Sequence, residues 1–151
     1  QLISILVPCY NEEAVLHEFY RRTAAVIDGI SAYDFQFMFV NDGSKDGTLS
    51  IMHELREKDD RVSYVNLSRN FGKEIAMTAG IDYLTGDAAI IMDADLQDPP
   101  ELIPEMISWW EKGYQDVSAK RRSRAGEPFS RNGRPMLFIR FCKTFQCAHA
   151  A

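Results

Sequence analysis

Two aspartates separated by one residue, Asp93 and Asp95, are the strongest chemical signal in the sequence. Side chains at positions i and i+2 of an extended segment point the same way, so both carboxylates can face one ion. Carboxylate oxygens suit Mg²⁺ or Mn²⁺, and such an ion could bridge a diphosphate. Gln97 continues the alternation and could add a carbonyl oxygen. Solvated acidic turns have the same pattern, so the position of the pair in the fold decides between a metal site and a turn.

Short apolar segments alternate with helical patterns along the chain, and Asp93 directly follows one of the apolar segments. Continuous apolar runs predict strands at about 2–7, 35–40, 62–67, 88–92 and 116–119. Apolar periodicity and capping residues, Asp46 among them, predict helices at about 14–27, 48–58, 73–84 and 99–112. Because apolar strands that alternate with helices are buried on both faces, we expect an α/β fold with a largely parallel sheet.

Polar side chains follow each of the first four predicted strands, in the segments 8–13, 41–44, 68–70 and 93–98. Parallel strands end at one edge of a sheet, and ligands bind beyond that edge in open sheets of this kind. We therefore expect the four segments to form one carboxylate-rich site. This position favours a metal site over a solvated turn for Asp93 and Asp95.

Three side chains in these segments could hold a nucleotide base. Asp42 could accept a hydrogen bond from the N3–H of uracil, and Arg69 could donate one to a base carbonyl. Surface pairing or helix capping is the alternative for both residues. Tyr10 could stack on a base or pack as a partly buried ring. Glu12 and the residue after it could instead complement the positive end of the following helix.

The composition indicates one globular domain of 151 residues, of which 46% are hydrophobic. A formal net charge of -5 is the opposite of the balance expected for a nucleic-acid binder. The three cysteines form no CxxC pair, so we expect no disulfide framework. No apolar run has the length of a membrane span or the pattern of a signal peptide, and we expect no bilayer crossing.

Basic residues dominate the sequence after Lys112, in contrast to the acidic part before it. The segment 121–134 has the glycines and prolines of a loop. Four of its five arginines, Arg121, Arg122, Arg131 and Arg134, are candidates for phosphate contacts. The segment 136–145 mixes apolar and basic residues, which predicts an amphipathic helix. Such a helix could lie at a membrane interface or cover the sheet.

Four segments together resemble the family 2 glycosyltransferases, which have the GT-A fold. They are ISILVPCYNEE at 3–13, FVNDGSKDGT at 39–48, LSRNFG at 67–72 and IMDADLQDPP at 91–100. The branch they resemble is that of polyprenyl-phosphate glycosyltransferases, of the dolichyl-phosphate mannose synthase and undecaprenyl-phosphate sugar transferase type. The resemblance implies a Rossmann-like, mostly parallel sheet with helices on both faces. It also implies a nucleotide-sugar-binding core at 1–120, and at 121–151 the start of a truncated acceptor- and membrane-proximal region.

The resemblance also implies roles for single residues. The residues that would hold the nucleotide are Pro8, Tyr10, Glu12, Asp42, Arg69 and Asp93. Asp95 would be the main ligand of Mg²⁺ or Mn²⁺, with Asp93 and Gln97 beside it. Arg122, or its neighbour Arg121, and Arg131 would embrace the phosphates of donor and acceptor. The catalytic set implied is therefore Asp93, Asp95, Arg122 and Arg131.

The implied reaction is a transfer with inversion from a nucleotide-diphosphate sugar, with a UDP-sugar favoured, to a polyprenyl phosphate. A lipid phosphate is already an anionic nucleophile, so the sequence need not supply a strong general base. The resemblance places this reaction on the cytoplasmic side of a membrane surface. A polysaccharide acceptor is one alternative. A truncated fragment that binds a nucleotide without turnover is another, because the chain ends before the acceptor-side residues of the family. A sugar nucleotidyltransferase would need a glycine-rich basic loop where this chain has residues 8–12.

Overall fold

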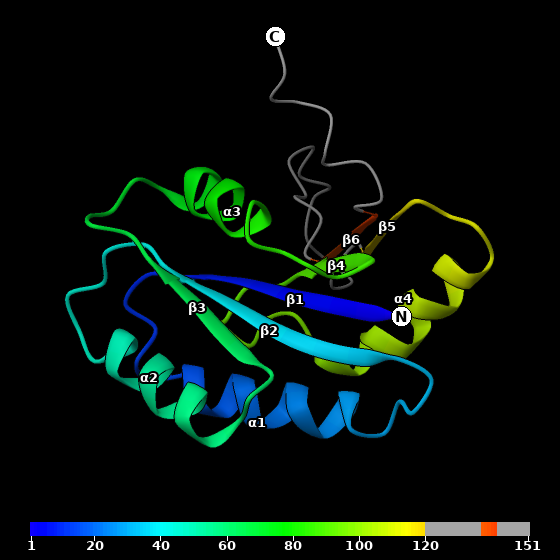
Figure 1. Cartoon of the computed structure of the whole chain (residues 1–151), viewed down its shortest axis with the longest axis horizontal. Helices are drawn as coiled ribbons and strands as arrows, with labels where there is room; N and C mark the ends of the chain where they lie inside the picture. The colour runs from blue at the N-terminus through cyan, green and yellow to red at the C-terminus, as the bar shows by residue number, and fades with distance from the viewer. Residues whose placement is uncertain (120–136, 142–151) are drawn as a thin grey trace, which may run out of the picture.

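The computed structural model describes residues 1–119 and 137–141, which form six strands and four helices around one sheet (Figure 1). The strands are β1 (Leu2–Cys9), β2 (Asp34–Asn41), β3 (Val62–Asn66), β4 (Ala88–Ile91), β5 (Asp116–Ala119) and β6 (Leu137–Phe141). The helices are α1 (Leu16–Ile27), α2 (Thr48–Lys58), α3 (Lys73–Ile81) and α4 (Ile103–Glu111), with a short 3₁₀ turn, η1 (Pro100–Leu102), before α4.

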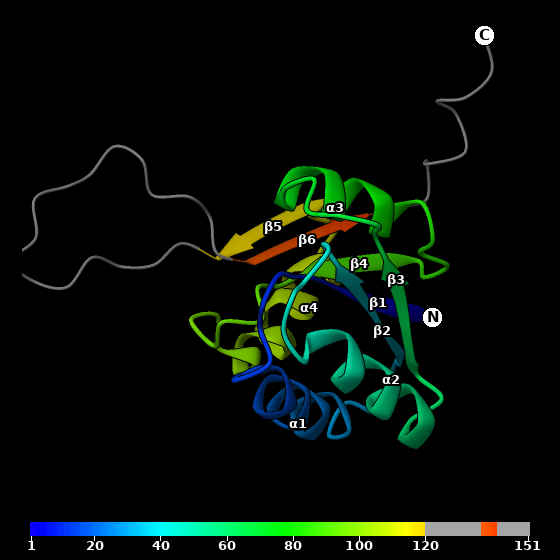
Figure 2. The same ribbon diagram turned by 90° about the vertical axis from the view of Figure 1, so that its left-hand side faces the viewer.

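The sheet has the strand order β3-β2-β1-β4-β6-β5. Strands β1 to β4 are parallel, whereas β6 is antiparallel to both β4 and β5. Helix α3 covers one face, and α1, α2 and α4 cover the other (Figure 2). The predicted α/β fold, with a mostly parallel sheet and helices on both faces, is therefore confirmed. No helix in the described part of the chain is both long and apolar enough to cross a bilayer.

Each central strand is buried on both faces, which explains the continuous apolar runs in the sequence. In β1, Ile5 belongs to the large core beneath α1, α2 and α4, whereas Leu6 belongs to a smaller core beneath α3. Three phenylalanines of β2 lie on the large-core side, and two of them, Phe37 and Phe39, stack with ring centroids 5.8 Å apart. The two cores fix the position of β1 between β2 and β4, and thereby the position of its polar carboxyl end.

The sequence-based prediction of a helix at 136–145 is wrong for residues 137–141, which form strand β6. Ile139 is in register with Ile90 of β4. The segment is rich in aromatic and β-branched residues, which favour strands. Pairing with β4 also satisfies backbone groups that a sheet edge would leave open. The basic loop at 121–134 and the residues 142–145 lie outside the described residues, and the predicted division near residue 120 stays a prediction.

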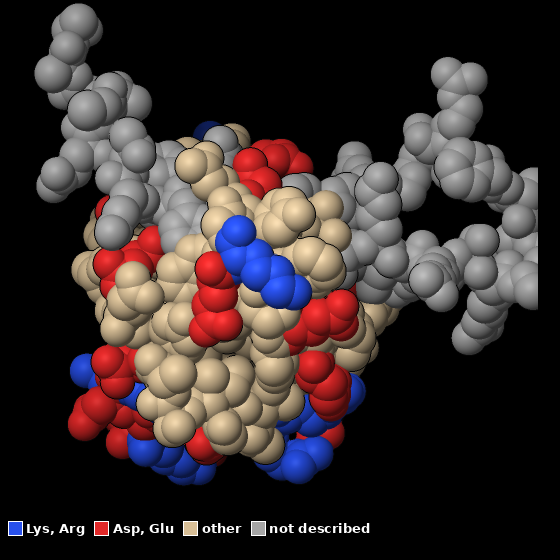
Figure 3. All heavy atoms as spheres, turned by 90° about the vertical axis from the view of Figure 1, so that its right-hand side faces the viewer, with Lys and Arg blue, Asp and Glu red and all other residues tan. Residues whose placement is uncertain are grey.

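The surface beside α4 carries exposed aromatic rings among charges of both signs. Trp109 and Tyr114 are both exposed, and their ring centroids lie 5.5 Å apart in an edge-to-face contact. The ammonium of Lys112 lies 4.1 Å from the centroid of the Trp109 ring. Figure 3 shows that acidic and basic side chains are interspersed on this side of the molecule. These aromatic rings therefore contact each other and a lysine while keeping much of their surface exposed.

A partly buried aspartate, Asp59, links α1, the C-terminal end of α2 and the segment before β3. Asp59 accepts hydrogen bonds from the hydroxyl of Tyr20 at 2.6 Å and from the guanidinium of Arg61. Arg61 also donates to Asp28 at 2.7 Å. Burial alone would raise the pKa of Asp59, but the hydrogen bonds from Arg61 and Tyr20 lower it to about 2. The ionised carboxylate therefore stabilises the fold.

We expect Asp59→Asn to lower the free energy of unfolding by about 1–2 kcal/mol at pH 7, because charged hydrogen bonds are lost. The folded-state pKa of about 2 lies below the ordinary value of about 3.9. The contribution of Asp59 is thus complete above about pH 4 and disappears as the pH falls towards 2. Urea unfolding at pH 7, 4 and 2.5 should show the difference between wild type and variant shrinking with acid. A constant difference would contradict this assignment.

The turn after β2 packs directly against the segment that follows β3. Gly43 has a φ of 65°, in the left-handed region that glycine adopts most easily. A Cβ atom at Gly43 would lie 2.3 Å from the backbone carbon of Arg69 and 2.5 Å from the nitrogen of Asn70. The absence of a side chain at Gly43 therefore lets the two loops approach each other.

Gly43→Ala should destabilise the fold by about 3 kcal/mol or more, because it combines backbone strain with a clash against backbone atoms. Gly113 is a matched control, since its φ of 95° is also positive but a Cβ there meets no atom within 4 Å. Gly113→Ala should cost only about 1–2 kcal/mol. Chemical denaturation of both variants measures the two losses. Equal losses would show that the approach of the two loops contributes nothing.

Candidate functional site

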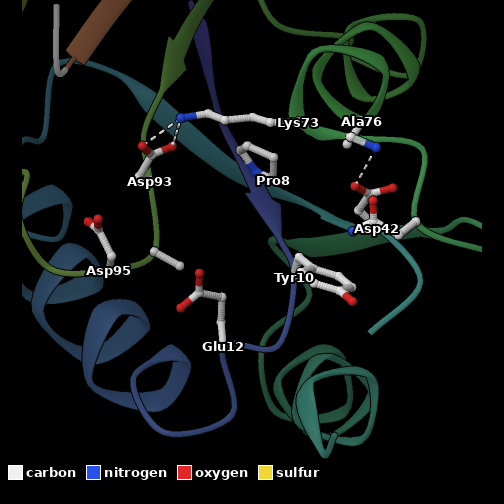
Figure 4. A pocket seen from close by; sticks show the side chains of 11 residues that line it. Pro8, Tyr10, Glu12, Asp42, Lys73, Ala76, Asp93 and Asp95 are labelled. Carbon is white, nitrogen blue, oxygen red and sulfur yellow. Dashed lines mark hydrogen bonds and ion pairs between the residues drawn. The ribbon is translucent and has the colours of Figure 1, made fainter. Parts of the chain in front are cut away.

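A pocket of about 260 Å³ opens at the carboxyl ends of β1, β2 and β4, beside the start of α3 (Figure 4). Six residues predicted from the sequence line it, namely Pro8, Tyr10, Glu12, Asp42, Asp93 and Asp95. The other lining residues are Asn70, Gly72, Lys73, Ala76 and Ala94. The residues come from four separate parts of the chain. The parallel strands thus bring together most of the residues that the sequence analysis selected.

Hydrogen bonds between two loops hold the segment after β1 in place. The backbone N–H of Asn11 donates to the hydroxyl of Ser44 at 3.0 Å, and the N–H of Glu12 donates to the hydroxyl of Thr48 at 2.8 Å. Glu13 accepts a hydrogen bond from the backbone N–H of Gly47, at the start of α2. Glu13 therefore complements the beginning of α2, whereas the carboxylate of Glu12 is left to line the pocket.

Three carboxylates gather on one side of the pocket. Figure 4 shows Asp93, Asp95 and Glu12 around the same part of the cavity. Burial raises the pKa of Glu12, and the negative charges of Asp95 and Asp93 raise it further. A pKa raised by like charges indicates a negative potential that a bound cation would relieve.

The residues present fit a divalent cation bound through oxygen atoms. Asp93 and Asp95 could supply hard oxygen ligands, and Glu12 adds negative charge beside them. Within residues 1–119, no group of three or more His, Cys, Asp or Glu side chains forms a ready metal centre. Two carboxylates are a small ligand set for Mg²⁺, which usually keeps several waters or takes oxygens from substrate phosphates.

The loop after Asp93 has a constrained backbone. Leu96 has a φ of 60°, which is uncommon for a residue with a branched side chain. The backbone N–H of Gln97 donates to Asp95 at 3.0 Å, so one carboxylate oxygen of Asp95 helps to shape its own loop. Gln97 is not among the residues that line the pocket. Its predicted role as a metal ligand stays a prediction.

Asp98 is a feature of this loop that the sequence analysis did not select. The side chain is only 2% exposed, and its Oδ2 atom has no hydrogen-bond partner within the described part of the chain. Burial raises the pKa of Asp98 to about 6, and the charges of Asp93 and Asp95 act in the same direction. The available signal in the sequence was the position of Asp98, after the acidic pair and directly before two prolines. In the structure this carboxyl group is buried where the chain enters η1.

Asp42 and Arg69 each contact the segment before α3, and their predicted role in holding a nucleotide base stays a prediction. Asp42 is 3% exposed and accepts hydrogen bonds from the backbone N–H groups of Phe71 at 2.8 Å and Gly72 at 2.9 Å. The guanidinium of Arg69 lies 4.7 Å from the centroid of the Phe71 ring. Asp42 therefore orders the loop before α3, close to the capping role that was its alternative. Tyr10 is 41% exposed at the pocket and offers a ring on which a base could stack.

Lys73 is the main pocket residue that the sequence analysis missed. Its ammonium lies 2.6 Å from the carboxylate oxygens of Asp93. Lys73 directly follows the segment 67–72 and begins α3, and this position was the available signal. The four candidate arginines of the basic segment, Arg121, Arg122, Arg131 and Arg134, lie outside the described residues, so their phosphate-binding roles stay predictions.

The sequence matches the model of the family described as glycosyl transferase family 2 over residues 4–149. It is 50% identical over 137 residues to a Bacillus subtilis protein named uncharacterized glycosyltransferase YkcC. The aligned region covers 91% of this chain and 42% of that protein. It is 46% identical over 123 residues to a prophage bactoprenol glucosyl transferase homolog of Escherichia coli, covering 82% of this chain and 40% of that protein.

The fold is also similar to solved glycosyltransferase structures. S. aureus TarS in complex with UDP aligns with a TM-score of 0.71 and 20% identity, over 93% of this chain and 47% of that chain. The mannosyltransferase PcManGT from Pyrobaculum calidifontis, in complex with GDP-Man and Mn²⁺, aligns with a TM-score of 0.62 and 24% identity, over 80% of this chain and 35% of that chain. The TM-scores show a common fold, and because the sequence identities are low, the similarity shows the fold alone.

The chain spans about two fifths of the length of the curated relatives that it matches. The match to the family model nevertheless covers nearly all of its residues. Together with the parallel sheet and the pocket at its carboxyl edge, this match shows that the chain belongs to glycosyl transferase family 2.

Proposed function

We propose that this chain forms the donor half of an inverting glycosyltransferase that moves a sugar from a nucleotide-diphosphate sugar to a polyprenyl phosphate. The observation that carries this proposal is the convergence of Asp93, Asp95, Glu12 and Tyr10 in one pocket at the carboxyl edge of the sheet. An edge of this type is where open parallel sheets bind nucleotides. The carboxylates suit a metal ion that accompanies a diphosphate, and the exposed ring of Tyr10 suits a base.

In this proposal each group in the pocket has a limited task. Asp93 and Asp95 hold Mg²⁺ or Mn²⁺, which when bound would stabilise the negative charge of the leaving diphosphate. Tyr10 orients the base, and Asp42 acts indirectly by keeping the backbone at residues 71 and 72 in place. Pro8 lines the pocket beside them. Gln97 as a third metal ligand, and Arg122 and Arg131 as phosphate ligands, belong to the proposal on the sequence pattern alone.

The proposed acceptor is a polyprenyl phosphate at a membrane surface, on the cytoplasmic side. The similarity to a bactoprenol glucosyl transferase homolog, at 46% identity, supports a lipid phosphate of this class. An ionised phosphate is nucleophilic without a general base, so the pocket needs no carboxylate dedicated to proton removal. Two solved structures of similar fold are complexes, one with UDP and the other with GDP-Man and Mn²⁺. We favour a UDP-sugar for this chain.

Donor binding is tested by thermal melts of the protein with Mn²⁺ and either UDP or GDP. Saturation at about one hundred times the dissociation constant should add about 2.7 kcal/mol of stability, which raises the melting temperature by several degrees. Asp95→Ala should abolish this shift, because the metal loses its main ligand. The control is Asp82→Ala, which removes an exposed carboxylate outside the pocket. An equal shift in wild type and Asp95→Ala would refute the donor site as drawn.

Acceptor choice is tested by mixing the protein with UDP-glucose or UDP-N-acetylglucosamine, Mn²⁺ and detergent micelles that contain undecaprenyl phosphate. We expect a glycosyl phospholipid by mass spectrometry, at a rate about a hundredfold or more lower in Asp95→Ala because charge on the leaving group is no longer stabilised. The anomeric configuration of the product, opposite to that of the donor, tests inversion. Sugar transfer to a polysaccharide in the absence of lipid phosphate would contradict the proposed acceptor.

A further inference from the structure

A lysine at the start of α3 forms an ion pair with one of the two aspartates proposed to bind metal. Lys73 is the first residue of α3, and its ammonium lies 2.6 Å from both Oδ1 and Oδ2 of Asp93. Figure 4 shows the lysine side chain extending across the pocket to reach this carboxylate. The side chains of Lys73 and Asp93 are 51% and 37% exposed, so both remain accessible to a ligand.

This contact differs from an ordinary surface ion pair in its surroundings. Of the described residues that line the pocket, Lys73 alone carries a positive charge, and it faces a wall formed by Glu12, Asp93 and Asp95. An ammonium and a divalent metal need the same carboxylate oxygens, and two cations on one carboxylate repel each other. In the pocket as it stands, Lys73 therefore opposes the binding of a metal ion to Asp93.

An incoming diphosphate would remove this opposition. Lys73 opens α3, and the beginning of a helix favours anions. A lysine on a flexible stem can exchange one anionic partner for another by rotation of its side chain. When phosphate oxygens accept hydrogen bonds from Lys73, both oxygens of Asp93 become free, while the diphosphate adds negative charge next to Asp95.

We propose that Lys73 is a built-in counter-cation that makes metal binding depend on the nucleotide. The inference rests on the donor site proposed above. Without nucleotide, Lys73 holds Asp93 and keeps the affinity for free metal low. With a diphosphate in the pocket, Lys73 moves to the phosphate oxygens and Asp93 turns to the metal. Nucleotide and metal therefore strengthen each other's binding through this residue as well as through their direct contact.

The test is a titration of the protein with Mn²⁺ in the absence of nucleotide, with free Mn²⁺ measured by electron paramagnetic resonance. We expect Lys73→Met to bind Mn²⁺ at least about fivefold more tightly than wild type, which is the lower end of typical coupling between sites. Lys73→Arg keeps the charge and should bind as weakly as wild type. Lys58→Met is the matched control, since Lys58 also pairs with a carboxylate but lies on α2, outside the pocket.

The second arm repeats the titration with saturating UDP. UDP should tighten Mn²⁺ binding by a larger factor in wild type than in Lys73→Met, and the two factors should differ by the same fivefold or more. UDP without metal should bind more weakly to Lys73→Met, because the phosphates lose a cationic partner.

Lys73→Met that binds free Mn²⁺ no more tightly than wild type would overturn the inference. The inference would also be overturned if Lys73→Arg bound free Mn²⁺ as tightly as Lys73→Met, because packing and not charge would then control the affinity. With either of these two outcomes, the proposed donor site still stands, without the role of Lys73, if the wild type binds Mn²⁺ in the presence of UDP. Failure of every variant to bind Mn²⁺, even with UDP, would overturn both the inference and the donor site.

Discussion

Parallel pairing of β1 with β2 and β4 is the constraint on which the proposed site depends. It brings the ends of three strands to one edge, so that Tyr10, Asp42 and Asp93 meet although they are far apart in the sequence. The pairing is fixed by cores on both faces of β1, where Ile5 and Leu6 point to opposite sides. Stability and site geometry are thus coupled, because a shift of β1 by one residue would exchange its two buried faces.

The same geometry creates an electrostatic problem, since strand ends that carry carboxylates are crowded together. The pKa of Glu12 is raised by burial and by the charges of Asp95 and Asp93, which shows how close these groups lie. The left-handed backbone of Leu96 and the enclosed carboxyl of Asp98 are further costs in the same loop. Strain and unpaired polar groups of this kind persist where a site needs them. In this structure the ammonium of Lys73 partly compensates the negative charge of the carboxylates. We propose that a metal ion, bound together with a diphosphate, takes over this role.

Patterns within short segments predicted much of this molecule. Apolar runs located β1 to β5 to within a few residues, because burial on both faces leaves a continuous apolar segment in the sequence. The acidic pair was recognised because it directly follows one of these apolar segments. Three features depend on distant parts of the chain; two of them were missed, and the third, the backbone partners of Asp42, was only an alternative. Strand β6 forms by pairing with β4, Lys73 meets Asp93 only after α3 has packed on the sheet, and Asp42 finds its partners in the backbone of residues 71 and 72. None of these contacts leaves a trace in local periodicity.

The donor site is tested most directly by a crystal structure of the protein soaked with UDP and Mn²⁺, with anomalous scattering used to locate the metal. We expect one strong manganese peak within bonding distance of a carboxylate oxygen of Asp95 and of the diphosphate, with the base against Tyr10. A manganese ion and a diphosphate bound away from the edge formed by β1, β2 and β4, or UDP in this pocket without any metal at Asp93 and Asp95, would contradict the proposed donor site.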